Sequence, residues 1–252
     1  MDKTSLGDRM KGYERSELRM LTYRAPLIIR IDGCHFHSFT KGFDRPFDIS
    51  FLNCMRETAK ALCNNIMGAK VAYTQSDEIS LLLTDDDTLE TQPWFGKNLQ
   101  KIVSVSAAMA TYYFNKAVED AFSYNTSSAG LTSAVVFERT AYFDSRAFLL
   151  PREEVNNYFE WRQQDCIRNS IQAVGQTYFS QKELSHKSCN DIKDMLLAQK
   201  GINWDEYPTD LKRGVCISKM FAPDNRMKWA IDKNIPIFHE NPDYINRLVY
   251  HE

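Results

Sequence analysis

The stretch Leu27-Ile28-Ile29-Arg30-Ile31-Asp32-Gly33 decides the fold of this chain. It is an apolar run that ends in an acid and a glycine, and β-branched isoleucine favours the packed surface of a strand. Pro26 precedes it, where a missing N–H group costs little. We therefore predict a buried strand over residues 27–33 with Asp32 at its carboxyl end. A carboxylate in that position is either a turn residue or the first ligand of a metal site.

The composition is that of an ordinary globular protein, with 252 residues, 43% of them hydrophobic and 25% charged. A net charge of -2 gives no overall basic field, so any RNA binding would depend on local patches. The six cysteines contain no C-x-x-C pair, which argues against a zinc site and favours a reducing compartment. No apolar run approaches the ~20 residues of a membrane span. We expect a cytoplasmic protein without a membrane segment.

Hydrophobic periodicity predicts further elements on both sides of a tight turn at residues 75–78. The expected helices cover residues 51–66, 97–120 and 153–179, and Asp48 or Ser50 can cap the first of them. The expected strands cover residues 71–74 and 79–83, with a fourth strand within 132–150 in the pieces 134–137 and 147–150. A small β-hairpin is expected from residues 226–231 and 236–238. The acid triplet at residues 85–87 is interpreted as a solvated turn.

The order strand, helix, strand, strand, helix, strand over the first 150 residues is that of a ferredoxin-like sheet. In that topology the third strand lies beside the first and antiparallel to it. The turn that carries Asp77 and Glu78 should then lie next to Asp32. Clustered carboxylates repel one another unless a cation lies between them, and oxygen ligands suit Mg²⁺. From the residues alone two interpretations stay open: a metal site, or ordinary cap and turn residues.

Several motifs taken together resemble those of the tRNA-His guanylyltransferase superfamily. Residues 30–39, R-I-D-G-C-H-F-H-S-F, resemble its R-[IL]-D-G-R-x-F-H-x-F motif, and residues 75–80, Q-S-D-E-I-S, resemble its G/Q-S-D-E-x-S motif. Segments 143–146, 161–165, 201–204 and 212–214 follow in the family's order. The resemblance implies an α+β fold with a βαββαβ catalytic domain like the palm of ordinary polymerases over residues 1–150. Residues 151–252 would form a helical and β extension packed on the palm.

Two departures from the eukaryotic pattern indicate a particular branch of this family. Cys34 stands where the first motif has arginine. In the segment that matches the eukaryotic H-I-N-N-L-Y-N, Ile167 replaces the histidine and only Asn169 is kept. The sequence instead resembles the bacterial and archaeal guanylyltransferase-like proteins, which are associated with repair of 5′-truncated tRNA.

The resemblance implies template-directed 3′–5′ nucleotide addition to the 5′ end of tRNA, after ATP or GTP has activated the 5′ phosphate. One alternative is addition of a guanylate at position −1 of tRNA-His. An alternative of another class is a non-catalytic tRNA-binding module. The family resemblance also implies a homotetramer arranged as a dimer of dimers.

The resemblance further implies roles for individual residues. Two Mg²⁺ ions would be held by Asp32, the Gly33 carbonyl and Asp77, with Glu78 as a third catalytic acid. The expected nucleotide-binding residues are Asp32, Gly33, Cys34, His35, Phe36, His37, Ser76, Asp77, Arg45 and Lys101. The expected contacts to tRNA or its phosphates are Arg30, Lys97, Arg162, Arg168, Asn169, Lys212 and Arg213.

Overall fold

Six antiparallel strands form one sheet in the order β4-β1-β3-β2-β5-β6. The computed structural model describes residues 4–123, 139–221 and 226–250, so the predicted strand piece at 134–137 lies outside the described residues. The strands are β1 (Leu27–Cys34), β2 (Ala69–Gln75), β3 (Glu78–Leu83), β4 (Tyr142–Leu149), β5 (Val215–Phe221) and β6 (Met227–Asp232).

The first four strands follow the ferredoxin-like order that the sequence predicts. β3 lies between β1 and β2 and runs antiparallel to both, while β4 pairs with the other edge of β1. The predicted hairpin is wrong in one strand: β6 pairs with β5, and residues 236–238 are not in a strand. Pro236 has no N–H group to donate to a strand ladder. Through β5, the second part of the chain extends the same sheet beyond β2.

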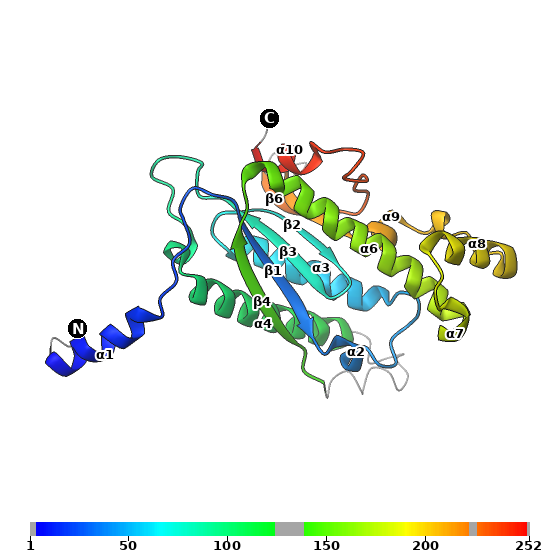
Figure 1. Cartoon of the computed structure of the whole chain (residues 1–252), viewed down its shortest axis with the longest axis horizontal. Helices are drawn as coiled ribbons and strands as arrows, with labels where there is room; N and C mark the ends of the chain where they lie inside the picture. The colour runs from blue at the N-terminus through cyan, green and yellow to red at the C-terminus, as the bar shows by residue number, and fades with distance from the viewer. Residues whose placement is uncertain (1–3, 124–138, 222–225, 251–252) are drawn as a thin grey trace.

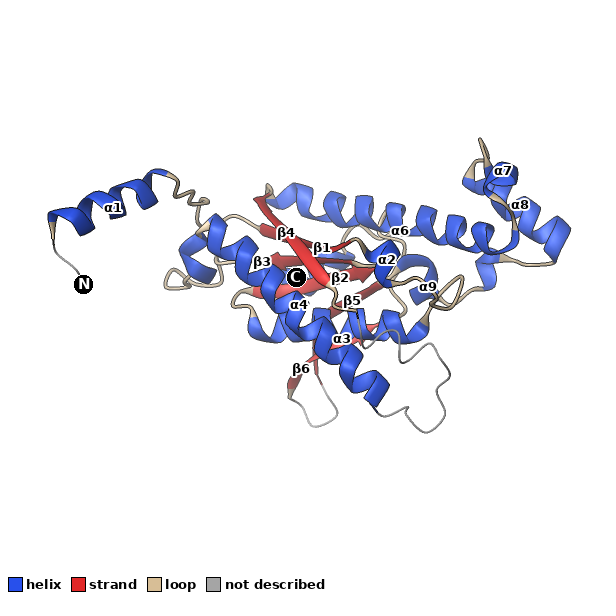
Figure 2. Cartoon of the chain, turned by 90° about the horizontal axis from the view of Figure 1, so that it is seen from below, coloured by secondary structure: helices blue, strands red, loops and turns tan. Residues whose placement is uncertain are grey.

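Helices cover both faces of the sheet and make three layers (Figures 1 and 2). α3 (Ile49–Asn65) and α4 (Leu99–Ser123) cover one face, and α6 (Val155–Tyr178) and α10 (Tyr244–Tyr250) cover the other. Successive β1 side chains point to opposite faces, so Ile29 and Ile31 pack in the core of α3 and α4, and Ile28 in the core of α6. Burial on both faces explains the continuous apolar run of β1.

The remaining helical segments lie around this framework. α1 (Ser5–Ser16) buries no residue and projects from the body of the molecule (Figure 1). None of the helices in the described ranges is long and apolar enough to cross a membrane. The other short helices and turns are α2 (Phe36–Phe39), η1 (Trp94–Lys97), η2 (Arg152–Glu154), α7 (Gln181–Leu184), α8 (Cys189–Lys200), η3 (Trp204–Glu206) and α9 (Thr209–Arg213).

The acid triplet at residues 85–87 is not a uniformly solvated turn. Asp85 is buried, and its carboxylate lies 2.9 Å from the amino group of Lys97. The same amino group donates to the carbonyl oxygens of Thr22 and Ala25, at 2.9 and 2.8 Å. The amino group therefore donates to two carbonyl oxygens and forms an ion pair with one carboxylate. This side chain joins the segment before β1 to the start of α4, so the structure does not place it where the predicted tRNA phosphate contact would need it.

Candidate functional site

The turn between β2 and β3 lies against the carboxyl end of β1, as the topology predicts. Gln75 pairs with Glu78, which leaves Ser76 and Asp77 as a two-residue turn. The backbone N–H of Gly33 donates to the carbonyl oxygen of Asp77 at 3.1 Å. Asp32 pairs directly with Glu78 across the β1–β3 ladder. The fold therefore brings together the three residues expected to hold metal ions, Asp32, Gly33 and Asp77.

Negative charge is concentrated at this end of the sheet. Burial raises the pKa of Asp77, and the charge of Asp32 raises it further. The pKa of the Cys34 thiol is also raised, first by burial and then by the charges of Asp144 and Asp32. No three His, Cys, Asp or Glu side chains of the described residues surround a common metal position. The expected donor set needs only two carboxylates and one backbone carbonyl, and these hard oxygen donors fit Mg²⁺.

Gly33 is required by the packing beneath the site. A β-carbon at this position would lie 2.3 Å from Cδ2 of Phe36. The Phe36 ring is buried among aromatic rings, with centroids 5.5 Å from Phe114 and 5.0 Å from Phe143. The predicted nucleotide contact of Phe36 is therefore open only to its backbone, because its side chain belongs to the core.

We expect Gly33→Ala to lower the free energy of unfolding by about 1–3 kcal/mol, as overpacking of a filled core does. The Phe36→Ala substitution removes Cγ, Cδ2 and Cε2, the three ring atoms that would clash. The double variant Gly33→Ala/Phe36→Ala should then lose less stability than the sum of the two single losses, measured by urea denaturation. Gly12→Ala is the matched control, because no atom lies within 4 Å of a β-carbon there. Additive losses in the double variant would contradict the steric explanation.

A cavity of about 330 Å³ opens beside Asp77, and we call it the Asp77 cavity. It brings the predicted residues His37, Arg45 and Ser76 to Asp77, although they come from three different segments of the chain. Figure 1 shows α2 close to the carboxyl end of β1. The cavity is lined by Phe36, His37, Thr40, Phe43, Asp44, Arg45, Pro46, Asp48, Phe51, Ser76 and Asp77.

The chemistry of the Asp77 cavity is mixed. The rings of Phe43 and Phe51 have centroids 6.0 Å apart and provide apolar surface. The Asp48 carboxylate is already used, because it accepts from the N–H groups of Phe51 at 2.9 Å and Asp44 at 3.2 Å and caps α3. Arg45 is exposed and contributes a positive charge. An aromatic surface, the cation of Arg45 and the carboxylate of Asp77 line one cavity, and this combination suits a planar base that carries phosphates.

Asp144 is a residue of this site that sequence reasoning missed. It lies on β4 and pairs with Asp32 across the β1–β4 ladder. One of its carboxylate oxygens lies 3.9 Å from the Cys34 sulfur, and the other accepts from Arg146 at 3.2 Å. The antiparallel register of β1 and β4 gives this neighbour directly. The motif at residues 143–146 contains this acid, but placing it at the site requires knowing that β4 pairs with β1.

Glu78 points away from the Asp77 cavity, toward α6. It is 6% exposed and accepts from Arg162 Nε at 2.7 Å and from Nη2 at 2.8 Å. Arg162 also donates to Asp165 at 2.8 Å. This bidentate pair holds the β2–β3 turn against α6, which favours a supporting role for Glu78 over direct catalysis. The Arg162 guanidinium is occupied by Glu78 and Asp165, so the structure does not present it to a tRNA.

The other predicted contacts fall into two groups. Lys212 is buried, its amino group donates to the carbonyl of Asp205, and burial lowers its pKa, so the structure does not present this amino group to a phosphate. Arg168 and Asn169 are exposed on α6, with Arg168 paired to Asp165. These two side chains are accessible to a large partner.

Three predicted residues lie apart from the Asp77 cavity. The guanidinium of Arg30 lies 5.9 Å from the ring centroid of Trp161, on the α6 face. Arg213 is half-buried and donates to the Ile235 carbonyl at 3.4 Å. Lys101 is exposed near the start of α4. The structure does not bring Lys101 to the Asp77 cavity.

Comparisons with known proteins agree with this geometry. The family model for tRNA(His) guanylyltransferase (Thg1) matches residues 7–151. The tRNA(His) guanylyltransferase of Schizosaccharomyces pombe is 29% identical over 81% of this chain and 77% of its own. That of Debaryomyces hansenii is 27% identical over 84% of this chain and 79% of its own.

Two solved structures of bacterial Thg1-like proteins are similar to this chain at higher sequence identity. A bacterial tRNA(His) guanylyltransferase (Thg1)-like protein in complex with ATP is 45% identical, with a TM-score of 0.88 over 98% of this chain and 100% of that one. A bacterial Thg1-like protein in complex with GTP is 44% identical, with a TM-score of 0.83 over the same shares. The chain belongs to the tRNA(His) guanylyltransferase family and is a nucleotidyltransferase.

Proposed function

We propose that this protein adds nucleotides to the 5′ end of tRNA in the 3′–5′ direction and so repairs 5′-truncated tRNA. Base pairing with the opposite acceptor strand would select each nucleotide. The observation that carries the proposal is that Asp32 and Gly33, at the end of β1, meet the turn that carries Asp77, in a chain of this family. The guanylyltransferase-like branch that Cys34 and Ile167 indicate is associated with repair, and the likeness to bacterial Thg1-like proteins agrees with that branch. The ATP and GTP of those structures support both nucleotides as substrates here.

The reaction consists of two phosphoryl transfers. First, an oxygen of the 5′ monophosphate attacks the α-phosphorus of ATP or GTP, and the bond to pyrophosphate breaks. Then the 3′-hydroxyl of the incoming nucleotide attacks the 5′ phosphorus of the RNA, and AMP or GMP leaves. Both steps depend mainly on positioning and on neutralising phosphate charge.

Residues in and beside the Asp77 cavity have different roles in these two steps. Asp32, the Gly33 carbonyl and Asp77 would hold two Mg²⁺ ions, which when bound supply Lewis-acid stabilisation of the transferring phosphate. The Arg45 guanidinium can hold phosphate oxygens in bidentate geometry. Asp44 is exposed and lines the cavity, so its carboxylate can accept from the amino group of a base that packs on Phe43. His37 lies at the same cavity, where its ring can donate to a phosphate.

The direct test uses a tRNA that lacks its first nucleotide, with Mg²⁺ and labelled nucleoside triphosphates. We expect growth at the 5′ end, templated by the opposite strand. Growth at the 3′ end would indicate a forward polymerase, and binding without growth would indicate a tRNA-binding module. Either outcome contradicts the proposal. Extension confined to one guanylate on tRNA-His would favour the guanylyltransferase proper over repair.

Two further expectations accompany this proposal. The family resemblance implies a homotetramer, which the mass in light scattering would test. We also propose that Arg168 and Asn169, both exposed on α6, contact tRNA. The cytoplasmic location stays a prediction from cysteine usage.

A further inference from the structure

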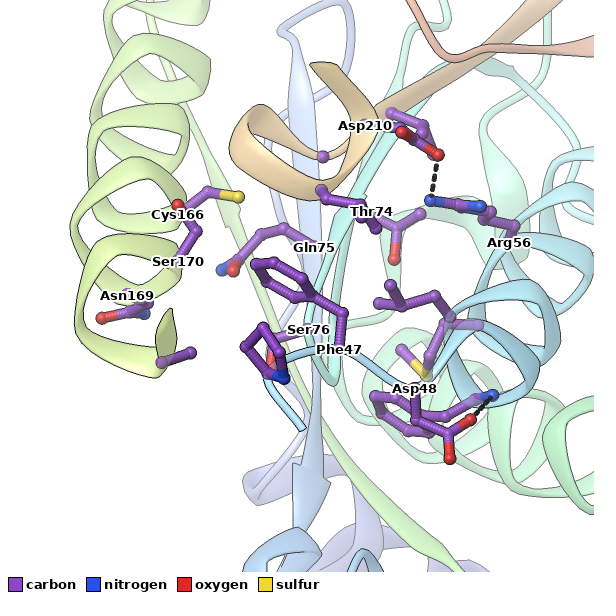
Figure 3. Close-up of a pocket in the computed structure, with 18 residues that line it drawn as sticks. Phe47, Asp48, Arg56, Thr74, Gln75, Ser76, Cys166, Asn169, Ser170 and Asp210 are labelled. Atoms are coloured by element: carbon purple, nitrogen blue, oxygen red, sulfur yellow. Dashed lines mark hydrogen bonds and ion pairs between the residues drawn. The ribbon is translucent and has the colours of Figure 1, made fainter. Parts of the chain in front are cut away.

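A second cavity adjoins the Asp77 cavity, and we call it the Gln75 pocket (Figure 3). Its volume is about 160 Å³. The two cavities share Pro46, Asp48, Phe51 and Ser76. The walls of the Gln75 pocket come from α3, α6, α9, the end of β2 and the segment before α3. The proposed function gives this pocket no role, although it lies next to the reacting groups.

The side chain of Gln75 is the unexplained polar group of this pocket. It is only 7% exposed, and its amide forms no hydrogen bond within the described part of the chain. Figure 3 shows the amide directed toward α6, on the side of Asn169 and Ser170. The amide atoms are not fully enclosed, so they keep access to the pocket, where water or a ligand can pair with them. An unpaired donor and acceptor aimed into a pocket therefore indicate a ligand with a matching polar edge.

The other polar groups of the wall already have partners. Arg56 donates to Asp210 at 2.7 Å, which neutralises its charge (Figure 3). The hydroxyl of Thr74 donates to the carbonyl of Glu78 at 2.8 Å, and that of Ser170 to the carbonyl of Ile167 at 2.8 Å. A wall without free positive charge does not suit phosphate. It suits a neutral group that exchanges hydrogen bonds with an amide.

The shape of the pocket restricts that group further. Its volume is close to the roughly 150 Å³ of an apolar protein cavity that takes up benzene. Phe47, Leu52 and Met55 make much of its surface apolar, and Phe47 adds an aromatic face. A glutamine amide offers one donor direction and one acceptor direction, which matches the edge of a nucleobase. Stacking on a side chain and pairing with an amide is how proteins hold unpaired bases.

We propose that the Gln75 pocket is a second nucleobase subsite, with the Gln75 amide as its base-reading group. Ser76 separates it from the Asp77 cavity, so two nucleotides can lie side by side at the acids. The inference rests on the proposed function in one respect. The two-step reaction needs a base besides that of the incoming nucleotide to be bound near the acids. That base comes from the activating nucleotide or from the 5′ end of the tRNA, and both offer the same chemistry.

The test compares Gln75→Met, which keeps the length of the side chain and removes its amide, with Gln199→Met, an exposed glutamine on α8. Truncated tRNA carrying a 5′ monophosphate requires activation, whereas a 5′ triphosphate does not. If the pocket holds the activating base, Gln75→Met raises the KM for ATP about tenfold or more, as loss of a hydrogen-bonded amide predicts. This increase appears only with the monophosphate substrate. Gln199→Met should leave the KM for ATP unchanged with both tRNA substrates.

The remaining outcomes are also decisive. A higher KM for tRNA with both substrates assigns the pocket to a tRNA base. Unchanged KM values for ATP, for the incoming nucleotide and for tRNA in a folded Gln75→Met variant would overturn the subsite. Failure of the unaltered protein to extend either tRNA would instead refute the proposed function. Equilibrium dialysis with adenosine then tests the subsite alone, with weaker binding by Gln75→Met expected and equal binding overturning it.

Discussion

Asp32→Asn and Asp77→Asn should each lower the rate of nucleotide addition by a factor of about a thousand or more, because several kcal/mol of transition-state stabilisation are lost. Each change keeps the shape of the side chain and removes one negative charge from the meeting point of β1 and the β2–β3 turn. Single-turnover rates on truncated tRNA, with and without prior activation of the 5′ end, would show whether both steps are lost.

The fold should survive these substitutions. Burial raises the pKa of Asp77, so its charge is unfavourable in the protein without a bound cation. In Asp77→Asn the amide oxygen can still accept from the Ser76 hydroxyl, which lies 3.0 Å from Oδ1 of the native carboxylate. We therefore expect Asp77→Asn to unfold in urea at the same concentration as the unaltered protein, or a higher one.

Magnesium provides a second readout that is independent of catalysis. An ion that binds only the native state raises the melting temperature with increasing concentration. The unaltered protein should show this increase, and Asp77→Asn should lose most of it. Asp86→Asn is the matched control, because Asp86 is exposed and lies in the segment after β3. Nucleotide addition at the full rate by Asp32→Asn or Asp77→Asn would refute the metal assignment.

Much of this site could be predicted because it depends on the order of the strands. The run at residues 27–33 indicates a strand buried on both faces, and the ferredoxin-like order then places the turn with Asp77 beside Asp32. Nothing in that reasoning needs the direction of a side chain. Asp144 was missed because its place beside Asp32 follows only from the register of β4 against β1.

Side-chain direction is where sequence reasoning fails. The spacing of Lys97 and Lys101 predicts neighbours on one face of a helix. In the structure Lys97 ends the turn η1 with φ 57°, before α4 begins, and its side chain points into the protein. Its partner Asp85 belongs to a segment that the sequence predicts to be a solvated turn. Burial of a lysine depends on the acids and carbonyls that surround it, and these come from distant segments.

Lys97→Met should lower the free energy of unfolding by about 3–5 kcal/mol, which is the usual effect of removing one partner from a buried ion pair. The side chains of Lys97 and Asp85 are 2% and 3% exposed. Without the ammonium group, the Asp85 carboxylate keeps only the N–H of Arg24, at 2.9 Å, and the carbonyls of Thr22 and Ala25 lose their donor. Urea denaturation at neutral pH measures the loss.

Two comparisons separate this explanation from a general effect of removing a lysine. Lys101→Met removes an exposed side chain one helical turn further on and should change the free energy of unfolding by less than about 0.5 kcal/mol. Lys97→Met/Asp85→Leu removes both buried charges, so it should be more stable than Lys97→Met alone. The double variant should regain only part of the lost free energy of unfolding, since the N–H of Arg24 then loses its acceptor. A double variant less stable than Lys97→Met would show that the Asp85 carboxylate stabilises the fold even without the ammonium group, and would contradict the explanation by a buried unpaired charge.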